Sequence, residues 1–225
     1  TVILTAAHQQ DLVHEAIASV RGQTTDRWQL VIMDAGPLAA GGAYDRYAGD
    51  ARVQVLTTGE TPALRQRVGI QGWAINEVWR RGRVRGDVVC CLCDDDALAA
   101  GWLEAVLRRA AARPAESAWH GRAELRSRDE GGQEQVLGVL GSSAVAGPAM
   151  PLRGKVDGMQ FACRRQAWVD WPEDRTVARE ADGHWMDSVA ARTPAHPLDA
   201  LAGVHRHTPT STFTRATAAG VGRVV

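Results

Sequence analysis

A run of apolar residues at 88–92 leads through Cys93 into three consecutive aspartates, Asp94, Asp95 and Asp96. An almost wholly apolar run of this length is typical of a central parallel strand that is covered on both faces. Three adjacent carboxylates at the end of such a strand repel one another, and their burial without partners is unfavourable. The fold must therefore bring a buried strand to an edge where solvent or a cation compensates these charges.

Strand-like and helix-like patterns alternate around this run. Four segments have the short apolar pattern of strands: 2–4, 28–33, 53–56 and 88–92. Three have apolar residues at helical spacing: about 11–20, about 64–80 and 102–107. Such alternation predicts an α/β fold with an open sheet, in which ligands bind at the carboxyl ends of the strands. Asp34 and the three aspartates occupy such ends.

The second half of the chain has a different pattern. Residues 118–127 and 133–139 flank the turn-forming residues 129–132, which predicts a β-hairpin. Residues 141–154 and the tail from Thr208 are rich in small residues, which predicts mobile loops. We expect one compact domain overall.

Charge and motif content exclude several functions. Lys plus Arg (26) balances Asp plus Glu (26), which removes the electrostatic support for a nucleic-acid or anionic-membrane binder. Lys155 is the single lysine, so no mechanism can use two. The sequence contains neither G-x-x-x-x-G-K-[ST] nor a G-x-G-x-x-G after a strand, so P-loop and dinucleotide-binding functions are not expected.

The cellular compartment is predicted from cysteines and hydropathy. No apolar run approaches the roughly 18 to 20 residues that a membrane span requires, and no charged-then-apolar leader opens the chain. Cys90, Cys91 and Cys93 crowd one apolar segment, unlike the spacing of a secreted disulfide framework. We therefore expect a cytoplasmic protein.

The aspartate run allows two interpretations. Mg²⁺ and Mn²⁺ are usually held by one or two carboxylates with phosphate oxygens and waters, so a metal-bridged diphosphate would fit. Alternatively, one aspartate caps the helix before Trp102 and the others face water. The residues alone leave both open.

Several segments in order resemble one enzyme family. They are 2–5 with 11–12 and 15–20, 23–24 with 28–34, 74–76 before 85–87, and 92–96 with 101–103. Together they resemble family 2 glycosyltransferases of the A-type nucleotide-sugar-binding fold (GT-A), including a spore-coat polysaccharide glycosyltransferase. The resemblance covers about 200 residues.

The resemblance implies a fold and a reaction. The fold would be a Rossmann-like mixed sheet flanked by helices, with residues 1–100 binding a nucleotide-sugar donor and 101–225 binding the acceptor. The reaction would move a sugar from UDP or dTDP to an acceptor hydroxyl or amine, with inversion and with Mn²⁺ or Mg²⁺ as cofactor. The acceptor stays open, and a homodimer is compatible with a catalytic domain of this size.

The resemblance also implies a donor site. Asp95 matches the metal-binding aspartate, with Asp94 near the donor ribose and Asp96 supporting. The first aspartate of the common D-x-D form falls on Cys93. Further nucleotide contacts are implied for the residues Thr5, Asp34 and Arg65. The aromatic residue that stacks on the base falls on Ala7, and the second acid of an Asp-Asp pair falls on Ala35, so the base stays open.

Catalytic and acceptor residues are implied in the second half. Asp182 matches the general base, with Glu180 as second choice, although Asp182 could instead cap the helix that begins there. Asp157 matches an acid that fixes the acceptor or donor sugar, with a turn residue as the alternative.

Two further site residues complete the prediction. Residues 204–207 resemble a Y-R-x-H ending whose histidine meets the metal or the diphosphate, which makes His207 a third metal ligand. If this segment is extended, we expect only one of His205 and His207 to face the site. Trp185, three residues after Asp182, would stack on a sugar, with core packing as the alternative.

Two other functions stay open. A sugar-1-phosphate nucleotidyltransferase uses a glycine-rich basic loop after the first strand, but residues 5–10 contain neither glycine nor Lys or Arg. A non-catalytic nucleotide- or glycan-binding module of the same fold is suggested by Ala7, Ala35 and Cys93.

Overall fold

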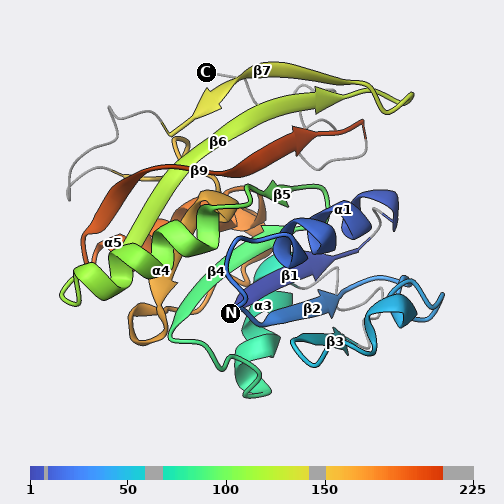
Figure 1. The fold of residues 1–225 in the computed structure, drawn as a ribbon, viewed down its shortest axis with the longest axis horizontal. Helices are drawn as coiled ribbons and strands as arrows, with labels where there is room; N and C mark the ends of the chain where they lie inside the picture. The colour runs from blue at the N-terminus through green and yellow to red at the C-terminus, as the bar shows by residue number, and fades with distance from the viewer. Residues whose placement is uncertain (8–9, 59–67, 142–150, 210–225) are drawn as a thin grey trace.

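One mixed sheet runs through the whole of the described structure (Figure 1). The computed structural model describes residues 1–7, 10–58, 68–141 and 151–209. Within these residues the sheet has nine strands in the order β3-β2-β1-β4-β8-β6-β9-β5, and β7 pairs with β6. The strands are β1 (Val2–Ala6), β2 (Leu30–Asp34), β3 (Val53–Thr57), β4 (Val88–Cys93), β5 (Ala97–Leu98), β6 (Ala118–Arg128), β7 (Glu134–Leu140), β8 (Phe161–Arg164) and β9 (Ala195–His207).

Helices pack on both faces of this sheet. The α-helices are α1 (Gln10–Arg21), α3 (Ile70–Arg80), α4 (Trp102–Ala112) and α5 (Ala181–Ala190). Short 3-10 turns are η1 (Asp45–Tyr47), η3 (Gly158–Gln160), η4 (Arg165–Ala167) and η5 (Arg175–Glu180). The predicted α/β class, with a mixed sheet flanked by helices, is confirmed.

The first four strands are parallel and closely aligned. Thr5 of β1 lies opposite Met33 of β2 and Cys93 of β4, so the carboxyl ends of three strands meet at one edge. Strand β3 extends the same parallel arrangement, with Asp34 opposite Thr57. The predicted meeting of Asp34 and the aspartate run at one sheet edge follows from this register.

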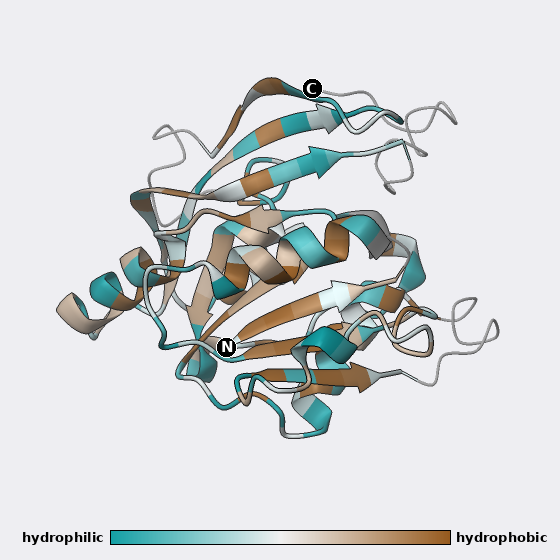
Figure 2. Cartoon of the chain, turned by 45° about the vertical axis from the view of Figure 1, so that its right-hand side comes forward, coloured by the Kyte–Doolittle hydropathy of each residue, from teal (hydrophilic) through white to brown (hydrophobic). Residues whose placement is uncertain are grey.

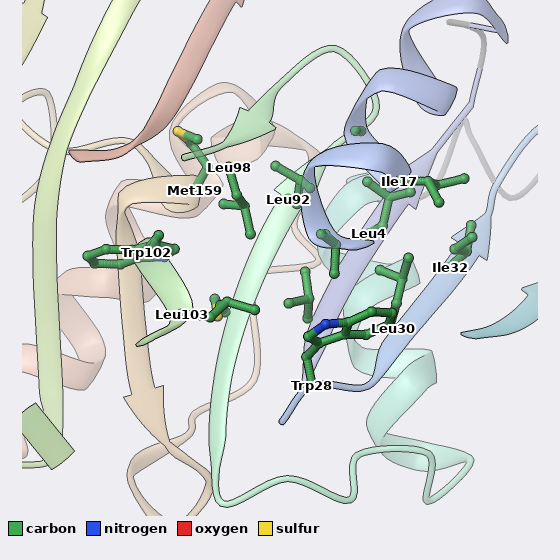
Figure 3. Packing of buried hydrophobic residues seen from close by; sticks show 14 of the residues in the cluster. Leu4, Ile17, Trp28, Leu30, Ile32, Leu92, Leu98, Trp102, Leu103 and Met159 are labelled. Carbon is green, nitrogen blue, oxygen red and sulfur yellow. The ribbon is translucent and has the colours of Figure 1, made fainter. Parts of the chain in front are cut away.

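The alternation of side chains along β4 produces two separate cores. Cys90 and Leu92 belong to the cluster that contains the apolar faces of α1 and α4. Val89 and Cys91 belong to the cluster that contains α3 and α5. Figure 3 shows the first cluster, where Leu92 faces apolar residues of the neighbouring elements. Strand β4 is thus covered on both faces, as its apolar run predicts, and Figure 2 shows how hydrophobic the parallel strands are.

The second half of the chain continues the same sheet. Strands β6 and β7 form the predicted hairpin. Strand β8 runs antiparallel to β4 and to β6, and β9 runs parallel to β6. Because β5 pairs with β9, the segment after the aspartates is held beside the end of β9.

Some predictions differ from the structure or fall outside it. The helix expected over 64–80 begins only at Ile70, and residues 59–67 lie outside the described part. Of the loops expected to be mobile, 142–150 and 210–225 also lie outside it. No α-helix among the described residues is long and apolar enough to cross a membrane. The division into donor and acceptor halves stays a prediction.

Gly203 allows the close pairing of β5 with β9 to be tested. A Cβ at this position would overlap the backbone oxygen of Ala97 and come 2.5 Å from Met159 Cε. We expect Gly203→Ala to lower the free energy of unfolding by about 1 to 3 kcal/mol, because overpacking forces the strands apart. Urea unfolding measures this.

The matched control is Gly138→Ala in β7. A Cβ there meets nothing within 4 Å. Its unfolding free energy should stay unchanged or rise by up to about 1 kcal/mol. Equal effects of the two substitutions would contradict the close pairing at Gly203.

Candidate active site at the end of the central strand

A tight turn between two strands carries the three aspartates. Strand β4 ends at Cys93, and the amide of Asp96 donates to Cys93 O at 3.3 Å. Strand β5 follows at once, with Ala97 opposite Val204 of β9. The carboxylates therefore stand at the carboxyl end of the central strand, beside the last residues of β9.

Asp96 is the most deeply buried acid of the turn, with 1% of its surface exposed. Its Oδ1 accepts a hydrogen bond from the backbone N–H of Arg206 at 3.0 Å. His205 Nδ1 lies 3.2 Å from the same oxygen. Asp96 Oδ2 has no hydrogen-bond partner among the described residues, which leaves a buried acceptor to be satisfied.

Two further acids lie near His205. Asp157 Oδ2 lies 3.6 Å from His205 Nδ1, and Asp157 Oδ1 accepts from the amide of Met159 at 3.0 Å as the cap of η3. Asp182, in the first turn of α5, accepts from the amide of Gly158 at 3.2 Å. Segments far apart in sequence thus bring four ionisable groups together: Asp96, Asp157, Asp182 and His205.

The charges of this cluster shift one another's protonation. Burial, followed by the negative charge of Asp157, raises the pKa of Asp182 to about 7. Burial raises the pKa of Asp95 and Asp96 as well. Burial alone would lower the pKa of His205, but Asp157 and Asp96 outweigh it and raise that pKa well above its ordinary value. Without another cation, the cluster therefore retains protons.

The cluster contains two groups of side chains suited to a metal ion. Cys93, Asp95 and Asp96 form one, and Asp96, Asp157 and His205 form the other, with the ligand atoms of each within 4.8 Å of one another. Both include Asp96, whose Oδ2 is buried and unpaired among the described residues. Carboxylate oxygens bind divalent ions, and each group adds one sulfur or nitrogen ligand, so these residues fit a divalent transition-metal ion such as Mn²⁺.

The predicted nucleotide residues lie along the same edge. Thr5 lies opposite Cys93, and Asp94 Oδ2 accepts from the amide of Ala7 at 2.8 Å. Asp34 accepts from the amides of Gly36 at 2.9 Å and Ala39 at 2.5 Å, which fixes the loop after β2. Arg65 lies outside the described residues. The contacts of these side chains with a nucleotide stay predictions.

Comparison with known proteins identifies the fold. No protein-family model and no curated protein matches the sequence. Among solved structures, TarS of S. aureus (residues 1–349) in complex with UDP-GlcNAc aligns with a TM-score of 0.68 and 11% identity, covering 95% of this chain and 60% of that one. The same protein in complex with UDP aligns with a TM-score of 0.66 and 12% identity, covering 92% and 60%. The mannosyltransferase PcManGT from Pyrobaculum calidifontis, in complex with GDP-Man and Mn²⁺, has a TM-score of 0.61 and 16% identity, covering 99% and 64%.

The chain has a GT-A glycosyltransferase fold. It spans about three-fifths of the TarS 1–349 chain and 64% of the PcManGT chain. At these low identities the likeness shows the fold. The more specific resemblance to a spore-coat enzyme of family 2 stays a prediction.

Within the GT-A fold, the predicted sugar-stacking role of Trp185 is wrong. This side chain is 0% exposed. Its Nε1 donates to Val169 O at 3.0 Å, and its ring stacks on Trp171 at a centroid distance of 4.9 Å. The alternative of core packing holds, because the helix face that follows Asp182 points into the sheet.

The two acids at the start of α5 have different surroundings. Glu180 precedes the helix, has 63% of its side chain exposed and lies 3.6 Å from Arg153 Nη1. Asp182 lies inside the first turn, so the alternative in which it caps the helix is wrong. Of the two candidates for a base, Asp182 is the one beside Asp157 and His205.

The expectation that only one of His205 and His207 faces the site is wrong. Residues two apart in a strand share a face, and the two rings lie 5.1 Å apart in an edge-on arrangement. His205 is the ring beside Asp96 and Asp157. Burial, followed by the charge of His205, lowers the pKa of His207. A metal contact of His207 stays a prediction.

Arg206 holds the turn and was missed at the sequence level. Besides its backbone bond to Asp96, its Nη1 donates to Asp95 O at 3.3 Å. Its Nε donates to Glu134 at 2.6 Å, and its Nη2 lies 2.9 Å from Glu15. The side chain is only 8% exposed. The local pattern gave no clear signal, because Arg206 lies between two histidines at the polar end of β9 and only the folded chain pairs it with acids.

These pKa shifts predict how stability depends on pH in ion-free buffer. Asp95, Asp96, Asp182 and His205 all have raised pKa values, so the folded protein binds more protons than the unfolded chain near neutral pH. Their stabilisation is therefore lost as pH rises through the folded pKa values. With EDTA present, we expect the free energy of unfolding to fall between pH 6.5 and 8.5, with a shallower slope in Asp182→Asn.

Mn²⁺ should reverse this loss. A cation replaces the protons, so its stabilisation should be larger at pH 8 than at pH 6.5. Urea unfolding at both pH values measures this. An identical pH slope in the wild type and Asp182→Asn would contradict the raised pKa.

Proposed function

We propose that this protein is a metal-dependent, inverting glycosyltransferase that moves a sugar from a nucleotide diphosphate sugar to an acceptor hydroxyl or amine. The observation that carries the proposal is the convergence of Asp96, Asp157, Asp182 and His205 at the carboxyl end of β4 in a GT-A fold. Support comes from the fold's neighbours, which are structures in complex with UDP, UDP-GlcNAc, or GDP-Man and Mn²⁺.

The donor would bind along the edge formed by β1, β2 and β4. Asp95 and Asp96 would hold the ion, with His207 as a further candidate. When bound, a divalent ion neutralises the charge of a departing diphosphate as a Lewis acid. Thr5, Asp34 and Asp94 are the proposed nucleotide contacts, with UDP or dTDP as the proposed donor nucleotides.

The hydrogen bond from Ala7 N to Asp94 supports this arrangement. This bond connects the loop after β1 to the turn that carries the aspartates, so the residues proposed to contact the nucleotide and the metal are held in fixed relative positions. In this proposal residues 1–100 bind the donor, and the later segments that carry Asp157 and Asp182 face the acceptor.

Asp182 is the proposed general base. A carboxyl group with a pKa of about 7 can accept a proton at neutral pH, and the amide of Gly158 orients it. The acceptor oxygen would give its proton to Asp182 and bond to the anomeric carbon. The bond from that carbon to the diphosphate oxygen breaks, and the nucleoside diphosphate leaves with the electron pair. A single displacement inverts the configuration. Asp157 is the proposed contact to the bound sugar or acceptor.

Asp95→Asn tests the proposed ion and donor site. Removing one carboxylate should abolish the Mn²⁺-dependent gain in affinity for nucleoside diphosphates, because Asp95 would hold the ion that neutralises the diphosphate. Calorimetry with UDP, dTDP and GDP, with and without Mn²⁺, measures this and identifies the base.

Asp199→Asn is the matched control, because the Asp199 side chain is 97% exposed and pairs only with Arg122 among the described residues. It should bind like the wild type. Undiminished metal-dependent affinity in Asp95→Asn would refute the assignment.

Asp182→Asn tests the base. We expect donor affinity to remain and turnover to fall by at least the order of 10², since an asparagine amide cannot accept the proton of the acceptor group. In the wild type the rate should rise with pH along a limb near or below pH 7, because the base must be ionised. In Asp182→Asn the remaining rate should no longer rise with pH in this range. Glu180→Gln should keep both the wild-type rate and its rise with pH.

The reaction itself separates the alternatives. Slow release of nucleoside diphosphate from a donor with Mn²⁺ supports a glycosyltransferase. Pyrophosphate exchange would instead indicate a sugar-1-phosphate nucleotidyltransferase, and binding without either reaction a non-catalytic module.

A further inference from the structure

Cys93 stands inside the proposed ion site. It is the last residue of β4, and its Sγ lies within 4.8 Å of carboxylate oxygens of Asp95 and Asp96. Gln71 Nε2 of α3 donates to this sulfur at 3.1 Å. The sulfur therefore acts as an acceptor at the same point where the two carboxylates converge.

A second observation is that one carboxylate oxygen of this cluster has no partner among the described residues. Asp96 is 1% exposed, and its Oδ2 has no hydrogen-bond partner among the described residues. The backbone N–H of Arg206 and Nδ1 of His205 both contact the other oxygen, Oδ1. A buried carboxylate oxygen without a partner requires a hydrogen-bond donor or a cation. Because the sulfur of Cys93 lies close to the Asp96 carboxylate, a cation bound there could contact both.

Neither group of metal-ligating side chains consists of oxygen ligands alone. The first contributes the sulfur of Cys93, and the second contributes a nitrogen of His205. Mg²⁺ is held by oxygen ligands, whereas thiolate and imidazole favour transition metals and Zn²⁺. The composition of the site thus points away from magnesium.

We propose that Cys93 is a direct ligand of the divalent ion and makes the site select Zn²⁺, Co²⁺ and related thiophilic ions over Mg²⁺. The inference rests on the proposed metal site and specifies the class of ion that it takes. On binding, the thiol proton leaves to solvent and the sulfur donates an electron pair to the ion. Gln71 then orients the sulfur from the outside of the site.

The first test uses the wild-type protein and Co²⁺. Sulfur ligation gives a thiolate-to-cobalt charge-transfer absorption in the near ultraviolet, which carboxylate ligation does not give. We expect this band to saturate at one Co²⁺ per chain and to disappear in Cys93→Ser. A wild-type spectrum without the band overturns the proposal even if the variant fails to fold.

The second test compares ion affinities by calorimetry with Cd²⁺ and Mg²⁺. Cys93→Ser should lose at least about ten-fold in Cd²⁺ affinity, the lower end of what perturbing a metal site costs. Its Mg²⁺ affinity should change much less. Cys93→Asp should shift selectivity the other way, towards Mg²⁺, because it supplies a third carboxylate.

Cys163→Ala is the matched control, since Cys163 is buried in β8 and belongs to neither ligand group. It should bind Cd²⁺ like the wild type. Unchanged Cd²⁺ affinity in Cys93→Ser overturns the role of Cys93 and leaves the proposed glycosyltransferase intact. Absence of any divalent-ion binding in the wild type would overturn the ion site itself.

Discussion

Repulsion among carboxylates at the end of β4 is the constraint on which the rest of the site depends. Backbone amides donate to four of these acids. The amide of Ala7 donates to Asp94, that of Arg206 to Asp96, that of Met159 to Asp157 and that of Gly158 to Asp182. His205 is the ionisable base placed directly against two of them. Amides orient a carboxylate without cancelling its charge, so the cluster still attracts protons or a cation.

The fold can hold such a cluster because β4 is fixed from both sides. Its alternating residues belong to two different cores, one with α1 and α4 and one with α3 and α5. Beyond the strand, the turn is held by the pairing of β5 with β9 and by the guanidinium of Arg206. That side chain also contacts Glu134 and Glu15, so the position of the acids depends on the hairpin and on α1 together.

Local pattern predicted the parallel half of the sheet, because apolar runs and helical spacing report burial directly. The same applies to the β6–β7 hairpin. The pairing of β9 with β6 joins residues more distant in sequence and was not predictable from local pattern. The position of Arg206 depends on this pairing, so it was not predictable either. Trp185 shows a different limit. Its spacing from Asp182 defined a helix face, but only the surrounding rings decide that this face is core. For His205 and His207 the error lay in the parity of an extended strand, which puts both on one face.

In the proposed reaction the same repulsion also links the two halves of the site. Asp182 carries a raised pKa because it is buried beside Asp157, while Asp157 in turn faces His205, which faces Asp96. Any positive charge that arrives at Asp96 therefore lowers the proton affinity of the chain of groups that ends at Asp182, since coupled sites titrate as a unit. Arrival of a cation with the donor would therefore release protons from this cluster, to which the proposed base Asp182 belongs. Mutual repulsion within a buried cluster of acids can in this way favour an order of steps in which donor binding precedes activation of the acceptor.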